Sequence, residues 1–515
     1  MKIVKRFLLI LISVFAVTVA KAEVIEIWTK AQLETIRTNV SNGNDYSSST
    51  LKLMTDLDLG EWTPIGTDYS GTNVFRGKFD GQGYTIRIQV STNSTLLGLF
   101  GYLDGTVEHL KIIGSIANTE TTNSSYTGSI AAYNYGTIRE CANEASIVGT
   151  TAGGIVGENA GAISYCYNQG YVGATNNWGS NYQLGGIAGN CNNGSISDSY
   201  AQCAIDYVSS IGGITANQDV TSPTCHYDVT HYKKETKITG SESLIGNALQ
   251  ASFDNAVWTF ADELLPELTC LTNKTVRIGN TINNDAAIDI NQAKTATVEL
   301  SGRTLYKDNS WNTLCLPFSI GADALGSTPL ADATIMAFSS ASHVGDVLTL
   351  CFTSTTNIEA GKPYLVKWAS GANIVSPQFT GVTISNVNES DCKVRQTGDG
   401  DRWVDFVGTF SPVELSHDGT MLYLGSSNNL YAPKDAGYMM NTCRAYFHLS
   451  ESFTDAGAAA RSIVLTFDDE PSTTGISTRH TTVTSSWTAL DGRRLSARPQ
   501  QRGIYLHEGR KMVIR

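Results

Sequence analysis

The sequence predicts an all-β protein, with an N-terminal parallel β-helix (a solenoid) followed by a β-sandwich domain and a short C-terminal β tail. Three observations predict this fold. A glycine-rich phrase recurs between residues 98 and 216. Charged residues make up only 16% of the chain whereas Gly occurs 48 times, proportions that suit many turns. Strand-like segments without a regular period fill the second half.

The repeated phrase defines the coils of the predicted solenoid. It reads GLFG at 98–101, GSIAA at 128–132, GGIVG at 153–157, GGIAG at 185–189 and GGITA at 212–216. Gly and a strand-like segment follow each of the first four phrases, after three residues in the first three cases and after four in the fourth. A period of roughly 25 residues is typical of one coil of a parallel β-helix with three short strands. The equivalent positions are spaced by 31, 25, 32 and 27 residues: Gly98, Ser129, Gly154, Gly186 and Gly213.

Two inward columns of apolar side chains are expected from this register. A single coil cannot bury its own apolar face, so stacking on the next coil stabilises it. At the start of the solenoid, Thr29 and Gln32 have the spacing of a capping box and predict a short helix that ends near Asn39 and covers the first coil. The predicted solenoid spans residues 23–268. The columns are Leu99, Ile130, Ile155, Ile187 and Ile214, and Val107, Ile138, Ile163 and Ile196.

Two insertions carry the candidate binding residues. The longer periods hold their extra residues just before the repeated phrase, around residues 119–126 and 174–182, which predicts projection from one side of the solenoid. Sugars stack on aromatic faces while amides bind their polar edges. An alternative is that Trp178 folds back over its own loop. The candidate ligand-binding residues are Tyr126, Asn176, Asn177, Trp178, Asn181 and Tyr182.

The start of the chain indicates export. Residues 1–22 have the positive start, short apolar stretch and small residues of a signal peptide. No later apolar run reaches the length of a membrane span, so the mature chain is expected to have no membrane-spanning segment.

Residues 271–470 are interpreted as a β-sandwich domain, residues 471–486 as a polar linker, and residues 487–515 as a few short strands.

Charge and cysteine content narrow the class of partner. The formal net charge is −12, but residues 1–22 carry +4 and residues 487–515 carry +5, so residues 23–486 carry −21. This acidic body disfavours nucleic acid and anionic membrane as partners. None of the ten cysteines forms a CxxC pair. Cys141 and Cys166 share a repeat position with Leu110 and Ser199, which favours free thiols in the core, although disulfides stay open in an exported chain.

The repeats resemble a known family. The phrases GGIVGENAGAISYCYN and GGIAGNCNNGSISDSYA are similar to the GLUG-motif repeats of bacterial surface proteins. The C-terminal half resembles a β-rich module of exported proteins from anaerobic Gram-negative bacteria, and the tail LDGRRL…RGIYLHEGRKMVIR is similar to type IX secretion sorting segments. The resemblance implies display on the outer cell surface, adhesion, and contact of the tail with secretion machinery. The linker departs from the usual sorting pattern.

Catalytic and metal-binding patterns are missing from the sequence. No HExxH, GxSxG or phosphate-binding loop is present. His226 and His231 are five residues apart in an irregular stretch, a weak metal signal. Arg76 and Lys78 precede Asp80, but their glycine-rich setting favours a solvated turn. We therefore expect no catalytic residues, no metal and no cofactor.

The sequence predicts a non-enzymatic, adhesin-like surface protein that binds a glycan or a host or neighbour surface. One alternative is a polysaccharide-cleaving β-helix enzyme, which measurable depolymerisation would reveal. The other is a structural spacer on the cell surface, for which replacing Trp178 and Tyr182 with Ala leaves binding unchanged.

Overall fold

The structure is a computed structural model and describes residues 23–514, apart from residues 69–71, 122–124, 176–181, 218–223, 233, 235, 240, 246–248, 273, 346, 398–401, 426–427, 451–461, 469, 477–486, 490–493, 496–502 and 508–509. The signal-peptide prediction therefore falls outside the described residues. The chain forms two compact units, Met1–Arg303 with Val375–Asn386 and Thr304–Ile374 with Val387–Arg515.

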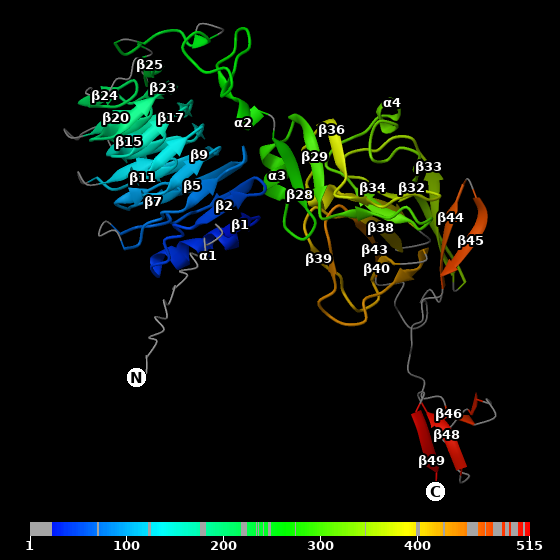
Figure 1. The fold of residues 1–515 in the computed structure, drawn as a ribbon. Coiled ribbons are helices and arrows are strands. Elements are labelled where there is room, and N and C mark those ends of the chain that lie inside the picture. The colour runs from blue at the N-terminus through cyan, green and yellow to red at the C-terminus, as the bar shows by residue number, and fades with distance from the viewer. Residues whose placement is uncertain are drawn as a thin grey trace, which may run out of the picture. The chain divides into compact units, whose positions relative to one another are not determined.

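Stacked parallel strands form the solenoid of the first unit (Figure 1). Each coil passes through four sheets instead of three strands, because the glycine-rich phrase divides into two short strands on either side of a turn. One complete coil comprises β8 (Thr106–Glu108), β9 (Lys111–Asn118), β10 (Tyr126–Gly128) and β11 (Ala131–Asn134). We number the sheets first to fourth in this order along the coil.

The remaining strands repeat this sequence of sheets. The first sheet also contains β1 (Glu23–Ile27), β2 (Ser49–Leu53), β4 (Lys78–Asp80), β12 (Thr137–Arg139), β17 (Ala162–Ser164) and β22 (Ser195–Ser197). The second contains β3 (Leu57–Gly60), β5 (Thr85–Thr92), β13 (Ala142–Asn143), β14 (Ser146–Gly149), β18 (Tyr167–Asn168), β19 (Val172–Ala174), β23 (Tyr200–Ile205) and β25 (His226–His231). The third contains β6 (Leu96–Leu97), β15 (Thr151–Gly153), β20 (Gln183–Gly185) and β24 (Ser210–Gly212), and the fourth β7 (Phe100–Leu103), β16 (Val156–Asn159) and β21 (Ala188–Cys191).

Both predicted apolar columns are confirmed. Ile138 pairs with Val107 on one side and Ile163 on the other, and Ile163 pairs with Ile196. All members of both columns are buried. The helix α1 (Lys30–Ser41) has the predicted capping box and buries its apolar side chains against the same core. The solenoid is thus held together by stacked columns that a helix covers at its first coil.

Both insertions connect the second sheet to the third, as the register predicts. One joins β9 to β10 and the other joins β19 to β20. The Thr175 hydroxyl donates to the carbonyl of Asn118 at 2.8 Å, which ties the bases of the two insertions together.

A small sheet that the sequence did not predict belongs to the solenoid unit. It contains β28 (Thr275–Gly279), β29 (Thr295–Ser301) and β36 (Gln378–Thr383), with α3 (Asp285–Ile290) between the first two. The buried carboxylate of Asp56 in the solenoid binds Lys274 Nζ at 2.5 Å and Asn291 Nδ2 at 2.7 Å. The predicted boundary near residue 270 therefore differs from the observed one, because these contacts attach residues 274–303 to the solenoid.

The second unit contains the predicted β-sandwich. Its larger sheet comprises β31 (Asn312–Cys315), β34 (Pro363–Lys367), β32 (Thr334–Val344), β33 (Val347–Ser354), β44 (Ser462–Phe467) and β45 (Glu470–Ile476). The other comprises β37 (Lys393–Thr397), β38 (Trp403–Gly408), β43 (Ala445–Leu449), β40 (Met421–Leu424) and β41 (Leu430–Tyr431). Aromatic rings from both sheets meet in the core, where the rings of Phe338 and Phe406 lie 6.1 Å apart.

The remaining elements of the described chain are short. They are β26 (Trp258–Thr259), β27 (Glu267–Leu268), α2 (Thr269–Thr272), β30 (Thr304–Leu305), α4 (Ala322–Leu325), β35 (Ile374–Val375), the 3₁₀ helix Glu389–Asp391, β39 (Val413–Glu414) and β42 (Met439–Met440).

The C-terminal segments differ in part from the prediction. The start of the predicted linker forms β45, which pairs antiparallel with β44, so the polar Ser/Thr sequence there is an edge strand. The tail forms an antiparallel sheet of β47 (Arg494–Leu495), β46 (Trp487–Ala489), β48 (Gly503–His507) and β49 (Arg510–Ile514), in that order.

None of the ten cysteines, all of which lie in the described residues, forms a disulfide, and Cys141 and Cys166 are buried in the core as the repeat register predicts. Among the residues that the structure describes, no helix combines the length and apolar character needed to cross a membrane.

Candidate functional site

The structure places the predicted binding residues in different settings. Asn176, Asn177, Trp178 and Asn181 lie outside the described residues. Tyr182 is only 3% exposed, so its ring does not form an exposed platform for a ligand. Tyr126 is half-buried in β10 and belongs to a cluster of aromatic rings on the solenoid surface.

This tyrosine cluster comprises Tyr102, Tyr126, Tyr133 and Tyr135. Tyr102 and Tyr133 are paired in register on β7 and β11, and their rings stack at 5.5 Å. The ring of Tyr135 stacks on that of Tyr133 at 5.1 Å, and Tyr126 meets Tyr133 edge-on at the same distance. Tyr135 is 43% exposed and lies at the edge of a surface groove.

The floor of the groove is a column of glycines at the corner between the fourth and first sheets. Gly105, Gly136, Gly161 and Gly194 occupy the same position in successive coils, each directly before a residue of the paired strands β8, β12, β17 and β22. A Cβ atom on Gly136 would lie 2.0 Å from the carbonyl oxygen of Gly105, and one on Gly161 would lie 2.2 Å from that of Gly136. Only glycine lets the coils approach this closely, so the floor is bare backbone.

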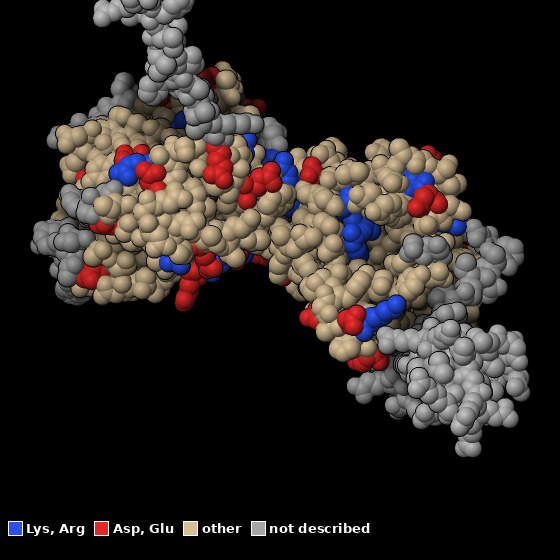
Figure 2. All heavy atoms as spheres, turned by 60° about the horizontal axis from the view of Figure 1, so that its bottom comes forward, with Lys and Arg blue, Asp and Glu red and all other residues tan. Residues whose placement is uncertain are grey.

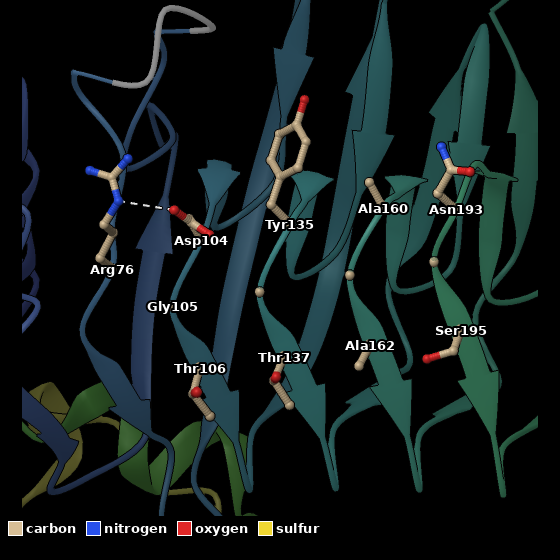
Figure 3. A pocket seen from close by; sticks show the side chains of 13 residues that line it. Arg76, Asp104, Gly105, Thr106, Tyr135, Thr137, Ala160, Ala162, Asn193 and Ser195 are labelled. Atoms are coloured by element: carbon tan, nitrogen blue, oxygen red, sulfur yellow. Dashed lines mark hydrogen bonds and ion pairs between the residues drawn. The ribbon is translucent and has the colours of Figure 1, made fainter.

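Two rows of side chains form the walls of the groove, which has a volume of about 580 Å³ (Figure 3). Each row takes one residue from each of four successive coils, immediately before or after the glycine. Hydroxyl and amide groups stand in these rows beside small alanines and one aromatic ring. The rows are Asp104, Tyr135, Ala160 and Asn193 on one side, and Thr106, Thr137, Ala162 and Ser195 on the other.

An ion pair lies at the first coil of the groove. Arg76 Nε is 2.9 Å from Asp104 Oδ2, and Arg76 Nη1 is 3.5 Å from Asp45 Oδ2. The guanidinium charge is therefore balanced by carboxylates of the protein. Among the described lining residues, Arg76 and Asp104 are the charged side chains of the groove.

The wider surface is also sparsely charged. On the face shown in Figure 2, Lys, Arg, Asp and Glu form small separate groups, and most of the described surface is uncharged. Lys and Arg do not gather into an extended patch there. A surface of this kind does not provide the basic stripe that tracks a nucleic acid backbone.

A charged cluster lies on the same first sheet, at the carboxyl ends of its strands, whereas the groove lies at their amino ends. Asp80, Glu108 and His109 bring potential metal-ligand atoms within 4.8 Å of one another. However, Glu108 is 2% exposed and already contacts Lys78 Nζ at 2.5 Å and Arg139 Nη2 at 2.5 Å. The side chains of Lys78 and Arg139 thus supply the positive charge that a cation would bring, and the cluster serves as a ladder of ion pairs across the strands.

The pKa values of this cluster follow from its hydrogen bonds. Burial disfavours the charged form of Asp80, but hydrogen bonds from His109 and the Gln82 N–H outweigh it and lower the pKa. Burial likewise opposes ionisation of Glu108, and the bonds from Lys78 and Arg139 prevail and lower its pKa. The hydrogen bond to Asp80 and the nearby carboxylates raise the pKa of His109.

The stability of the solenoid unit is expected to depend on pH through this cluster. Since the pKa of His109 is raised in the fold, its contribution is present below the ordinary value of 6.5 and is lost as the pH rises further. The lowered pKa values of Asp80 and Glu108 mean that their contribution is lost in acid. Thermal unfolding between about pH 5 and about pH 8.5 measures the alkaline loss. The His109→Gln variant should lack it, and an equal decline in both proteins would contradict the assignment.

Sequence reasoning missed both the groove and the ion-pair ladder. The glycines of the floor were visible as the Gly that follows each repeated phrase. The ring of Tyr135, directly before one of these glycines, could not be recognised as exposed from the sequence, because Tyr135 belongs to neither apolar column. Asp80, Glu108 and Arg139 are far apart in sequence, and only the strand register brings them into one row.

Comparisons with known proteins add little. No protein-family model matches the chain, and a comparison with curated proteins finds no match. A search of solved structures finds the crystal structure of a "putative immunoglobulin A1 protease" from Bacteroides ovatus. It is 18% identical with a TM-score of 0.36, and the match covers 48% of this chain and 92% of that one. A likeness at this level supports no inference about activity.

Proposed function

We propose that this protein binds a neutral glycan in the groove of its solenoid and does not cleave it. The observation that carries the proposal is the exposed ring of Tyr135 at the edge of a groove with a glycine floor, whose other lining side chains are small, hydroxyl or amide groups apart from the paired Arg76 and Asp104. Pyranose rings present apolar faces that pack on aromatic rings and hydroxyls that bind to polar groups. A rigid floor of backbone pre-organises such a site and reduces the ordering that binding requires.

The lining of the groove favours binding over catalysis. Cleavage of a glycosidic bond ordinarily uses two carboxyl groups that flank the scissile bond. Among the described lining residues, Asp104 supplies one carboxylate, and Arg76 pairs with it. The carboxylates of Asp80 and Glu108 are engaged with His109, Lys78 and Arg139. We therefore favour a non-enzymatic role over a polysaccharide-cleaving enzyme.

The proposal places the protein on the outer surface of a bacterial cell. The positive and apolar start of the sequence supports export. The GLUG-like phrases support a role in adhesion to a host or neighbouring cell, with the solenoid as a rigid platform. We assign the C-terminal tail to contact with secretion machinery, on the resemblance of its sequence to sorting segments.

Replacing Tyr135 with Ala is expected to weaken glycan binding by about 10- to 30-fold, the loss typical of removing an aromatic hot spot. Affinity electrophoresis through gels that contain neutral polysaccharides measures the effect as a loss of retardation. Tyr207→Ala is the matched control, because Tyr207 is 61% exposed on the same unit but does not line the groove. Equal retardation of the wild type and the Tyr135 variant would rule out the groove as the binding site.

A further inference from the structure

We propose that the groove takes an extended, unbranched stretch of a neutral polysaccharide that lies along the solenoid axis, with successive sugars facing successive coils. The inference rests on the proposed function and specifies its ligand. The alternatives within that function are a single terminal sugar, which would occupy one coil, and an acidic polymer.

The strand register makes the groove a periodic site. Thr137 pairs with Thr106 and with Ala162, and Ala162 pairs with Ser195, so equivalent wall positions repeat at the spacing of adjacent strands. Four coils separated by about 4.8 Å extend the groove over roughly 14 Å. The rise of one sugar in an extended β-linked chain is close to one strand spacing. A linear polymer can therefore stay in register with the coils, whereas a compact ligand leaves most of the groove empty.

The chemistry along the groove also differs from coil to coil. Tyr135 offers a ring at the second coil, and Asn193 and Ser195 offer amide and hydroxyl groups at the fourth. Ala160 and Ala162 stand on either side of Gly161 and leave the third coil open. The ligand is thus held by stacking at the second coil and by hydrogen bonds at the fourth, with an unobstructed passage at the third.

The backbone of the floor excludes a peptide strand as the occupant. A peptide that extends a sheet needs free N–H and C=O groups at an edge. Here the carbonyls of Gly105, Gly136 and Gly161 accept hydrogen bonds from the next coil, at 2.9, 2.9 and 2.8 Å. A ligand can therefore pack against the floor, but these carbonyls are already hydrogen-bonded and cannot pair with an added peptide strand.

The electrostatics favour a neutral polymer. A polyanion needs cationic groups along its length, yet the cation of the described lining, Arg76, is held by Asp104 and Asp45. The remaining described wall residues carry hydroxyl, amide, methyl or phenol groups.

The test is the dependence of affinity on chain length. Isothermal titration calorimetry is carried out with cello-, manno- and xylo-oligosaccharides of one to six sugars. In the series that binds, the affinity should rise with chain length up to about four sugars and then level off. Equal affinity for the monosaccharide and the hexasaccharide would overturn the axial arrangement while leaving glycan binding intact. Absence of binding to every series and to the neutral polysaccharide gels would contradict the proposed function and this inference together.

A blocking variant tests the same arrangement independently. Ala162→Trp fills the open third coil and should lower hexasaccharide affinity at least 10-fold, to the level that the wild type shows for a disaccharide. Ser164→Trp is the matched control, since Ser164 is on the same strand but does not line the groove. Unfolding temperatures of both variants establish that they fold, and Ala160→Trp replaces Ala162→Trp if the latter does not. Unchanged hexasaccharide affinity in a folded blocking variant would overturn the proposal.

Discussion

Asp56→Ala is expected to destabilise the solenoid unit by about 3–5 kcal/mol, the range for removing one partner of a buried ion pair. The Asp56 side chain is 0% exposed and binds Lys274 Nζ at 2.5 Å, Asn291 Nδ2 at 2.7 Å and the Thr85 backbone N–H at 2.6 Å. The substitution would remove this charged acceptor from the Lys274 ammonium group, the Asn291 amide and the Thr85 N–H, although Asn291 Nδ2 keeps its bond to the Ala287 carbonyl at 2.7 Å. Because these contacts fix residues 274–303 to the solenoid, that segment should detach first.

Urea denaturation followed by fluorescence, together with hydrogen exchange of β28 and β29, measures this effect. Asp58→Ala is the matched control two residues away. Asp58 is 38% exposed and contacts Arg87 at 3.3 Å, so its loss should cost less than about 1 kcal/mol. Similar shifts for the two variants would show that the buried network does not hold the small sheet in place.

Gly136→Val is expected to cost about 3 kcal/mol or more, at or above the upper end of the range for overpacking. The first added atom would lie 2.0 Å from the backbone oxygen of Gly105, and a backbone atom in a stacked coil cannot rotate away. The coils must separate locally, which breaks the hydrogen bond from Thr137 N–H to Gly105 and distorts the groove floor.

Thermal unfolding of purified Gly136→Val measures the loss directly. Ala160→Val adds bulk to the groove wall instead of its floor and should change stability by less than about 1 kcal/mol. A wild-type unfolding temperature for Gly136→Val would contradict the close approach of the coils. If the variant does not fold, Gly136→Ala introduces the same contact with fewer atoms.

The repeat made the solenoid predictable, because each inward column draws on residues at one position of every coil. Ile138 and Ile163 could be aligned from sequence alone, and they pair as expected. The number of strands per coil was less accessible. A turn inside the repeated phrase separates Gly128 from Ala131, and nothing in an apolar pattern of this length distinguishes a bent strand from two strands.

Features that depend on single residues were harder to predict. Tyr135 and Arg139 occur in one coil only, so no column marks them. The predicted sandwich begins at residue 271 and so includes β28 and β29, which the structure places in the solenoid unit. The attachment of these strands depends on the contact of Lys274 with Asp56, a pairing that spans 218 residues and leaves no local signal in the sequence. The sequence therefore predicts features that repeat from coil to coil, whereas a feature that depends on one long-range contact can be recognised only in the structure.

Among all these measurements, a glycan array read with the full chain and with its Tyr135→Ala variant tests the central claim most directly, followed by a reducing-end assay on each polysaccharide that binds. Our account predicts binding of the wild type to neutral linear glycans, loss of that binding in the variant, and no release of new reducing ends. Undiminished binding by the variant, or measurable depolymerisation by the wild type, would contradict it.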